Sequence, residues 1–509
     1  MKYKAPFLAL LFLAPVLAAQ EDLTSATARE KSSLQQELIL QNTREILRRL
    51  ETPHGVTAAS NSVSTVESLS GRLAELEKKL AAGPQVEAAP AEEAPQAASQ
   101  AGANAIWIIT AGALVFFMQA GFCLLELGLT RPKNAINICM KNALDFSAGA
   151  ICFLFVGFAL MFGASQGGWI GAGPFWLSGI GGSEPFWEFW FFQVVFSGTA
   201  ATIISGAMAE RTRFVGYLCF TVVMTSLIYP VIGHWAWGSL GGGFGYGGDK
   251  GWLEAMGYID FAGSSVVHGI GGAAALAGVL VLGPRQGRFR EDGSPNLIPG
   301  HNLPLAALGT FILWFGWYGF NAGSTLTADV SIGRIAVNTT IAPSAGALAA
   351  MLTVWIFQGR PDLSLTLNGA LGGLVGITAN CHCVTPAAAV LIGLVAGLVA
   401  TLGSIVLERL HVDDAVGAVP VHLFCGWWGI LAVALFHEEG FSPARLGVQA
   451  LGVASITAAA FTVAGVAFLL IDRLIGLRAT PEEQDLGLDF TEHSGTAYAG
   501  FVTSEKANV

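Results

Sequence analysis

Long apolar stretches separated by short polar loops fill the chain from residue 104 onward. Eleven can be counted, and most approach the roughly 20 residues that a helix needs to cross a bilayer. The eighth is short, and the eleventh is long enough to tilt strongly. They lie near residues 105–129, 143–163, 186–208, 214–237, 262–283, 303–323, 335–358, 365–379, 386–407, 419–436 and 446–476. The pattern predicts an all-α polytopic membrane domain over residues 104–478, with eleven transmembrane helices.

The chain before residue 104 has a different pattern. Residues 1–19 begin with Lys2 and Lys4, continue with a short apolar run and end on small residues, as a secretory signal peptide does. A short uncleaved anchor is the alternative. Either reading puts the residues that follow outside the cytoplasm.

Residues 20–80 are polar and helical in pattern, and their second part carries a coiled-coil seam. The seam positions follow the 3–4 spacing of a heptad: Val66, Leu69, Leu73, Leu76 and Leu80. Residues 81–103 are an Ala/Pro-rich linker. We therefore expect an extracytoplasmic helical or coiled-coil extension, with a loosely helical spacer as the plainer alternative.

Composition supports the membrane assignment. Charged residues make up 12% of the chain and hydrophobic residues 53%, whereas soluble proteins average about 25% charged residues. The 64 glycines suit close packing of membrane helices. The net charge of −10 resides mostly in the tails, and no basic patch indicates nucleic acid.

The positive charges predict the orientation. With the N-terminus outside, the cytoplasmic loops and the residues after the last helix hold Arg131, Lys133, Lys141, Arg211, Arg213, Arg285, Arg288, Arg290, Arg360, Arg409 and Arg478. The external loops hold Lys250, Arg334 and Arg445. Because positive residues favour the cytoplasmic side, residues 479–509 are expected to form a cytoplasmic tail. The protein is expected in a cell membrane, a bacterial inner membrane by this reading.

Two similar phrases suggest an internal repeat. "DFAGSSVVHG" runs from Asp260 to His268 and beyond, and "DAVGAVPVHL" runs from Asp414 to His422 and beyond, with the same spacing. They open the fifth and tenth helices. Five is odd, so the second set of five must insert upside down, and a long final helix follows. Inverted repeats are typical of transport proteins.

The repeat gives the two histidines matched positions. Eight residues of helix rise about 12 Å, so His268 and His422 would approach the bilayer centre from opposite faces and meet. A neutral imidazole pair shares one proton, with one ring donating and the other accepting. The plainer reading is one buried histidine in each half, satisfied by backbone.

Several stretches resemble the ammonium transporter (Amt/Mep/Rh) family, on the Amt side. They are "QVVFSGTAATIISGAMAER", "YPVIGHWAWG", "DFAGSSVVHG", "HNLPLAALGTFILWFGWYGFNAGS", "DDAVGAVPVHLFCGWWGILAVALF" and, in the tail, "GLRATPEEQDLGLDFTEHSGTAY". The resemblance covers about residues 104–498. It implies a homotrimer with one pore per protomer, a transporter rather than an enzyme, and no cofactor.

The resemblance also implies roles for particular residues. An outer recruitment site for ammonium, or its analogue methylammonium, corresponds to Phe196, Trp237 and Ser324. Two stacked rings that close the pore correspond to Phe196 and Phe320. The twin pore histidines correspond to His268 and His422, and the aspartate that organises the outer site corresponds to Asp260. A PII-type regulator is implied as a cytoplasmic partner of the tail.

Other readings remain open from sequence alone. An ammonium sensor of the same fold, a neutral gas channel of the Rh type and a redox protein with haem between His268 and His422 would each keep buried histidines. Cys381, His382 and Cys383 lack the four-ligand spacing of structural zinc, so we predict no metal site there.

Overall fold

The computed structural model describes residues 93–178 and 184–498, whose regular secondary structure is helical apart from one small hairpin. That hairpin pairs β1 (Ala164–Gln166) with β2 (Ile170–Ala172) in antiparallel fashion. The predicted signal peptide and the predicted coiled-coil seam lie outside the described residues.

The helical elements over the first five predicted spans are α-helices, short 3₁₀ helices in the loops, and π-helical turns that interrupt the second and fourth spans and open the fifth. In chain order they are α3 (Glu93–Leu129), η1 (Pro132–Asn134), α4 (Ala135–Cys152), η2 (Phe153–Gly157), α5 (Phe158–Phe162), η3 (Phe175–Leu177), α6 (Glu184–Ala207), α7 (Phe214–Val223), η4 (Met224–Ile228), α8 (Tyr229–Trp237), η5 (Gly238–Phe244), α9 (Trp252–Ala255), η6 (Ser264–Gly269) and α10 (Ile270–Leu282).

The remaining spans and the tail follow in the same way. They are α11 (Leu303–Gly323), α12 (Ser331–Gln358), α13 (Leu363–Thr378), α14 (Pro386–Arg409), η7 (Val419–Phe424), α15 (Cys425–Phe436), α16 (Pro443–Ile475), α17 (Pro481–Leu486) and α18 (Leu488–His493).

All eleven predicted spans are helical, but they are not equally long. Among the described residues, ten helical segments are long and apolar enough to cross a membrane. The one remaining predicted span is α13, which corresponds to the short eighth stretch. Its 16 residues rise about 24 Å, less than the roughly 30 Å of a hydrocarbon core.

The first helix begins earlier than the sequence pattern predicts. Residues 93–103, assigned above to the linker, form the first turns of α3. Most of them are Ala, Gln and Ser, and Ala and Gln are good helix formers. Pro95 lies in the first turn, where its missing N–H breaks no helical hydrogen bond. The last part of the predicted linker is therefore helical and continuous with the first span.

The second helix also begins earlier than predicted. The polar side chains of its first turns are buried in the fold, although the sequence pattern assigns them to a loop. Lys141, counted above as a loop charge, lies inside α4 and is fully buried. Its Nζ donates to the backbone oxygen of Ser205 at 3.4 Å and lies 5.4 Å from the centre of the Tyr217 ring. Hydropathy averaged over neighbouring residues does not include these partners, which are distant in the sequence.

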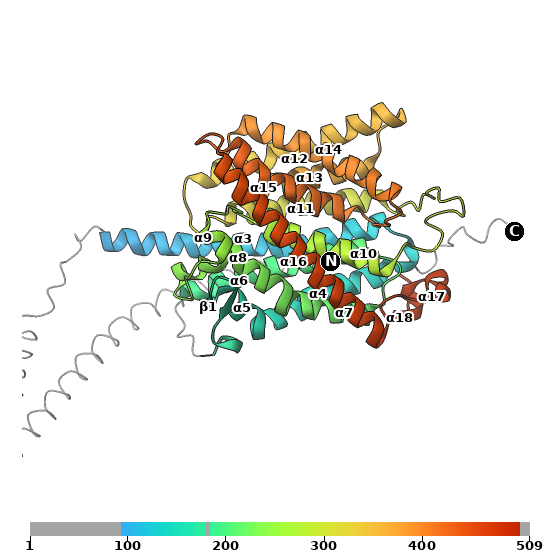
Figure 1. The fold of residues 1–509 in the computed structure, drawn as a ribbon, viewed down its shortest axis with the longest axis horizontal. Coiled ribbons are helices and arrows are strands. Elements are labelled where there is room, and N and C mark those ends of the chain that lie inside the picture. Colours follow the sequence, from blue (N-terminus) through green and yellow to red (C-terminus); the bar gives the residue numbers. More distant parts are fainter. Residues whose placement is uncertain (1–92, 179–183, 499–509) are drawn as a thin grey trace, which may run out of the picture. The chain divides into compact units, whose positions relative to one another are not determined.

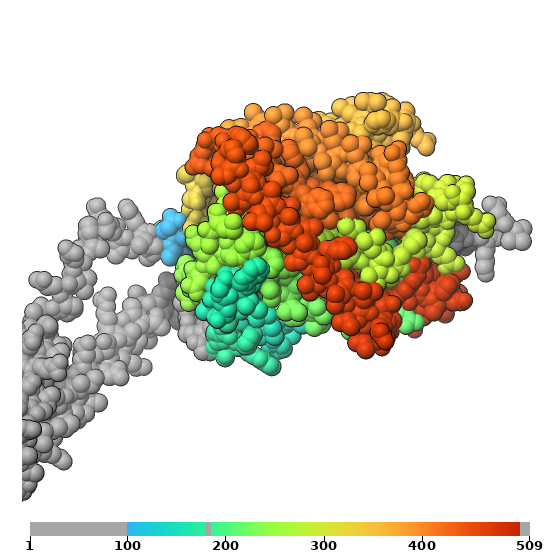
Figure 2. Space-filling view, viewed as in Figure 1, coloured from blue at the N-terminus to red at the C-terminus, as the bar shows by residue number. Residues whose placement is uncertain are grey.

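The helices of residues 97–498 pack around one apolar core. In Figure 1, α12, α13 and α14 lie together, and α16 runs diagonally over the bundle against α15, α10 and α7. Figure 2 shows α16 as a continuous band between residues of the first and second halves. The outer faces of α12, α14 and α16 expose apolar side chains, among them Leu352, Ile356, Phe357, Leu398, Leu402, Leu469 and Leu470. Such an exterior suits contact with lipid.

Candidate functional site

One buried carboxylate organises the start of η6. Asp260 Oδ1 accepts hydrogen bonds from the N–H groups of Gly263 and Ser264 at 2.9 and 2.8 Å. Its Oδ2 accepts from the N–H groups of Ser265 and Val266 and from the Ser265 hydroxyl, at 2.8, 2.9 and 2.7 Å. Asp260 thus satisfies the unpaired N–H groups of a helix start. Gly263 turns the chain there with a φ of 110°, which side chains disfavour.

The second half repeats this arrangement at η7. Asp414 Oδ1 accepts from the N–H groups of Val416 and Gly417 at 3.3 and 2.9 Å, and Oδ2 accepts from the N–H of Val419 at 2.7 Å. Gly417 has a φ of 80°. The Asp and Gly positions of the two sequence phrases therefore have the same structural role.

The two capped segments cross each other at very short range. A methyl group on Gly272 would lie 2.6 Å from the backbone nitrogen of Leu423. One on Gly426 would lie 2.5 Å from the carbonyl oxygen of Ser264 and 3.6 Å from the nitrogen of Gly269. Residue numbers rise along one segment as they fall along the other, so the segments are antiparallel. This direction agrees with the inverted repeat predicted from the sequence.

The crossing brings the two histidines into contact. His268 Nδ1 lies 3.1 Å from His422 Nδ1, and the rings are nearly parallel, with centroids 5.1 Å apart and an angle of 19°. A hydrogen bond between these nitrogens requires one ring to donate and the other to accept. The imidazoles thus meet, as the matched Asp–His spacing predicts. His268 Nε2 is buried and has no hydrogen-bond partner among the described residues.

Aromatic rings continue the line of the histidines on one side. Trp317 stacks on His268 with centroids 5.0 Å apart, and Phe320 lies 5.3 Å from the same imidazole. Phe320 stacks in turn on Phe196 at 4.2 Å and 25°, and Trp237 meets Phe196 edge-on at 6.1 Å. We call Trp237, Phe196, Phe320, His268 and His422 the column. Both phenylalanines are fully buried, so the column is closed at this point.

The remaining predicted residues, Asp260 and Ser324, are each joined to a member of the column by a hydrogen bond. Trp237 Nε1 donates to the backbone oxygen of Asp260 at 2.7 Å, which ties the indole to the start of η6. Ser324 directly follows α11, and its hydroxyl donates to the Phe320 carbonyl at 2.8 Å. The hydroxyl oxygen of Ser324 keeps its lone pairs as acceptors.

Sequence reasoning missed two rings of this site. Trp317 is fully buried, and its Nε1 donates to Thr378 Oγ1 at 2.8 Å. Phe122 lies 6.1 Å from the His422 ring. Trp317 precedes Phe320 by three residues and therefore shares its helix face, a signal that was available. No comparable signal in the sequence marks Phe122.

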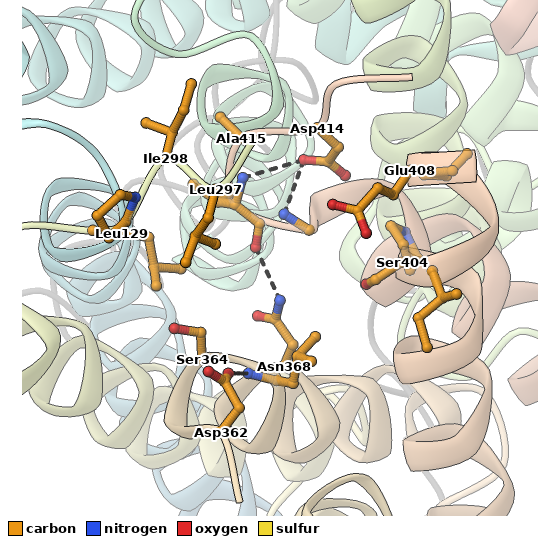
Figure 3. A pocket seen from close by; sticks show the side chains of 18 of the residues that line it. Leu129, Leu297, Ile298, Asp362, Ser364, Asn368, Ser404, Glu408, Asp414 and Ala415 are labelled. Atoms are coloured by element: carbon orange, nitrogen blue, oxygen red, sulfur yellow. Dashed lines mark hydrogen bonds between the residues drawn. The ribbon is translucent and has the colours of Figure 1, made fainter. Parts of the chain in front are cut away.

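Beyond His422 the site opens in two steps. A cavity of ≈ 20 Å³, lined by Phe122, Glu126 and His422 among others, has room for about one water. It shares Asn368, Val416 and Gly417 with a larger pocket of ≈ 400 Å³. Figure 3 shows that pocket with Asp414, Asn368, Ser404 and Glu408 around it, and Asn368 Nδ2 donates to the Val416 carbonyl at 3.0 Å. Leu297, which is 82% exposed, lines the same pocket, so the pocket reaches the surface.

Buried ion pairs support this Asp414 end. Arg285 donates to both carboxylate oxygens of Asp413 at 2.9 Å, and its Nη1 lies 3.5 Å from Glu210. Arg131 pairs with Glu210 at 2.7 Å. Burial alone would raise the pKa of both carboxyls, but the hydrogen bonds and charge of Arg285 hold the pKa of Asp413 well below its usual range, and Arg285 and Arg131 together lower the pKa of Glu210. Burial lowers the pKa of Arg211, beside them, to about 10.

The tail docks at the same end. The N–H of Asn137 donates to Asp489 Oδ1 at 2.9 Å, and the N–H of Leu488 donates to Asn134 Oδ1 at 3.0 Å. Glu492 accepts from the N–H of Phe214 at 3.1 and 3.0 Å. Helices α17 and α18 are thereby fixed against the starts of α4 and α7, so the tail packs on the bundle.

Comparisons with known proteins agree with one another. Residues 106–498 match the model of a family described as the Ammonium Transporter Family. The chain is 45% identical over 428 residues to ammonium transporter Amt2 of Archaeoglobus fulgidus, across 79% of this chain and 89% of the relative. It is 39% identical over 431 residues to ammonium transporter Amt1 of Haloferax mediterranei, across 81% and 82%.

Solved structures share the fold. A protein described as a sensor Amt protein aligns with a TM-score of 0.74 and 41% identity, over 77% of this chain and 98% of its own. Mep2 of Candida albicans aligns with a TM-score of 0.68 and 28% identity, over 75% and 87%.

Proposed function

The chain belongs to the ammonium transporter family, and from this we propose that it carries ammonium across the membrane by conducting ammonia along the column. The observation that carries the proposal is the unbroken series of rings from Trp237 to His422. It joins a cation-attracting aromatic end to a polar strip that the stacked rings of Phe196 and Phe320 separate from that end.

Recruitment takes place at the Trp237 end. Aromatic faces attract a cation by about 0.5–2 kcal/mol, and Trp237 and Phe196 offer such faces beside Ser324, whose oxygen accepts one ammonium N–H. Asp260 does not accept the proton in this scheme. Its two oxygens are engaged by the backbone of η6, so it organises the site.

Loss of a proton then separates ammonium from potassium. A potassium ion cannot become a small neutral molecule, whereas ammonium leaves a proton behind and continues as ammonia. The stacked rings of Phe196 and Phe320, 4.2 Å apart, must separate to let it pass. His268 and His422 then offer ammonia hydrogen-bond partners inside an otherwise apolar passage.

The orientation of the protein in the membrane is proposed from its charge distribution, and its partners are proposed from the family. The protein is a multi-pass membrane protein, and we assign the Trp237 end to the outside because positive loops gather at the other end. A bacterial inner membrane, a homotrimer and a PII-type regulator at the docked tail belong to the same proposal.

In this proposal the predicted coil of residues 66–80 holds the three protomers of the trimer together. Unchanged trimer stability in detergent after deletion of residues 21–92 would contradict this role.

An ammonium sensor is the second candidate, favoured by the solved relative described as a sensor. A neutral gas channel of the Rh type is the third. The three differ in what crosses the membrane. A transporter gives sustained uptake, a pure sensor gives none, and a gas channel gives uptake without current.

Uptake in a cell that lacks its own ammonium transporters tests the proposal. The wild-type chain should restore growth on low ammonium and accumulate labelled methylammonium. The double variant His268→Ala, His422→Ala removes the polar strip and should abolish uptake or its selectivity over potassium. His411→Ala changes an exposed histidine that contacts Gly293 at the other end and should leave uptake unchanged.

The proposal fails if the double variant, present in the membrane at the wild-type level, keeps normal selective uptake. It also fails if the wild-type chain supports none.

A further inference from the structure

A group of buried polar side chains lies beside the column and has no part in the transport path as described. Its member nearest the column is Glu126, which is 2% exposed. Glu126 Oε2 accepts from the Ser205 hydroxyl at 2.9 Å and from Asn142 Nδ2 at 3.1 Å. Burying a carboxylate is costly unless it has such partners.

The position of Glu126 relates it directly to the histidines. Phe122 and Glu126 are four residues apart on α3 and so share one face of that helix. Phe122 contacts the His422 ring, and Glu126 lines the ≈ 20 Å³ cavity together with that same ring. One water fits between the two groups. Glu126 is thus the first carboxyl group beyond the histidine pair on the way to the Asp414 end.

The other buried carboxyl groups nearby are engaged elsewhere. Asp414 uses both oxygens to hold the N–H groups of η7. Asp145 accepts from the Tyr217 hydroxyl at 2.7 Å and from Gln119 at 3.4 Å, and it does not line the cavity.

We propose that Glu126 takes up the proton that leaves the histidine pair and returns it to ammonia, which deepens the function proposed above and rests on it. The proton that ammonium gives up reaches the bare Nε2 of His268, which then passes its Nδ1 hydrogen to His422 along the Nδ1–Nδ1 bond. His422 releases its Nε2 hydrogen through a water in the ≈ 20 Å³ cavity to the Glu126 carboxylate. The neutral carboxyl group then protonates NH₃ to NH₄⁺ and is a carboxylate again. Each proton given up by one group is gained by the next, so the number of protons on the protein is restored. The Nδ1–Nδ1 hydrogen bond is then reversed, and both imidazoles must exchange tautomers before the next cycle.

The test uses the full-length protein in liposomes, with ammonium-induced current and methylammonium uptake measured together. Glu126→Gln keeps the length of the side chain and an oxygen for Ser205 and Asn142, but it cannot take up a proton. We expect the current to fall about tenfold or more, with its solvent isotope effect in D₂O altered. Glu126→Asp keeps the carboxyl group and should restore part of the current.

Asp145→Asn is the matched control, since it neutralises a buried carboxyl of the same group that does not reach the cavity. It should retain the wild-type current. Equal losses in Glu126→Gln and Asp145→Asn would overturn the inference in favour of a purely structural role, as would a Glu126→Gln current and isotope effect equal to wild type.

Failure of the inference is distinguishable from failure of the proposed function. Wild-type uptake without any current would overturn the role of Glu126 and leave the ammonia path intact. Absence of wild-type uptake would overturn the proposed function itself.

Discussion

At the scale of single residues, the site depends on side chains that hold other side chains in place. Trp317 illustrates this. Its indole stacks on His268 and is itself fixed by a hydrogen bond to Thr378. The imidazole therefore lies between one ring that orients it and another, His422, that shares its proton.

We predict that Trp317→Leu lowers ammonium flux severalfold while the protein still folds. Leucine fills part of the volume but offers no flat face, so His268 gains freedom to leave its contact with His422. Thr378→Val is the graded comparison, because it removes only the hydrogen bond to the indole. Uptake per folded protein should fall in the order wild type, Thr378→Val, Trp317→Leu, and equal uptake in all three would contradict this role.

The same scale shows what sequence reasoning can and cannot find. Asp260, His268, Asp414 and His422 were found because their spacing repeats, and a repeat needs no knowledge of partners. Trp317 was missed because a tryptophan in an apolar helix is usually packing, and only its distance to His268 distinguishes it. Glu126 was missed because its role depends on a cavity lined by four helical elements, α3, α6, α13 and η7.

At the scale of elements, the crossing of η6 with η7 sets the geometry of the pair. Gly272 and Gly426 each lie four residues after a histidine and allow the partner segment to approach within 2.6 and 2.5 Å of where a methyl group would be. A backbone contact this close fixes the distance between the imidazoles.

We predict that Gly272→Ala or Gly426→Ala destabilises the protein by about 1–3 kcal/mol and weakens the contact between His268 and His422. The added methyl group meets backbone, which cannot rotate away. Gly447→Ala on α16 is the matched control, since nothing lies within 4 Å of its added methyl group. Thermal unfolding in detergent should separate the variants, and a Gly272→Ala protein as stable as Gly447→Ala would contradict the prediction.

Helix boundaries show a different limit of sequence reasoning. The centres of the apolar stretches were predicted well, since hydropathy alone decides them. The start of α4 was placed too late because Asn137, Lys141 and Asn142 read as a polar loop, whereas in the fold Glu126, Tyr217 and the tail supply their partners. Buried polar partners come from distant parts of the chain, which local pattern does not contain.

At the scale of the whole molecule, the Asp414 end is held together by charges that join distant segments. Arg131, Glu210, Arg285 and Asp413 belong to four different parts of the chain. Both carboxyls have folded-state pKa values below their ordinary values. Their contribution to stability is therefore complete above the unfolded-state pKa of about 4 and is lost as pH falls through the folded-state pKa.

We predict that this contribution to the unfolding temperature in detergent is constant from about pH 8 to pH 5 and declines below about pH 4. Asp413→Asn leaves Arg285 buried with half of its partners, which costs about 3–5 kcal/mol, and it should flatten the acid decline. Asp292→Asn, in an exposed loop, is the comparison and should follow the wild-type profile. An Asp413→Asn protein with wild-type stability at pH 7 would contradict the role of this network.

The meeting of His268 and His422 has a consequence for the symmetry of the protein. The bond between their Nδ1 atoms holds one hydrogen, and exchanging the two halves would exchange donor and acceptor. The donating ring keeps a bare Nε2, and the accepting ring carries its hydrogen there. The two halves are inverted copies of one another, yet the hydrogen bond between them points from one half to the other, and neither half determines which way. The hydrogen bond reverses each time the hydrogen crosses from one ring to the other.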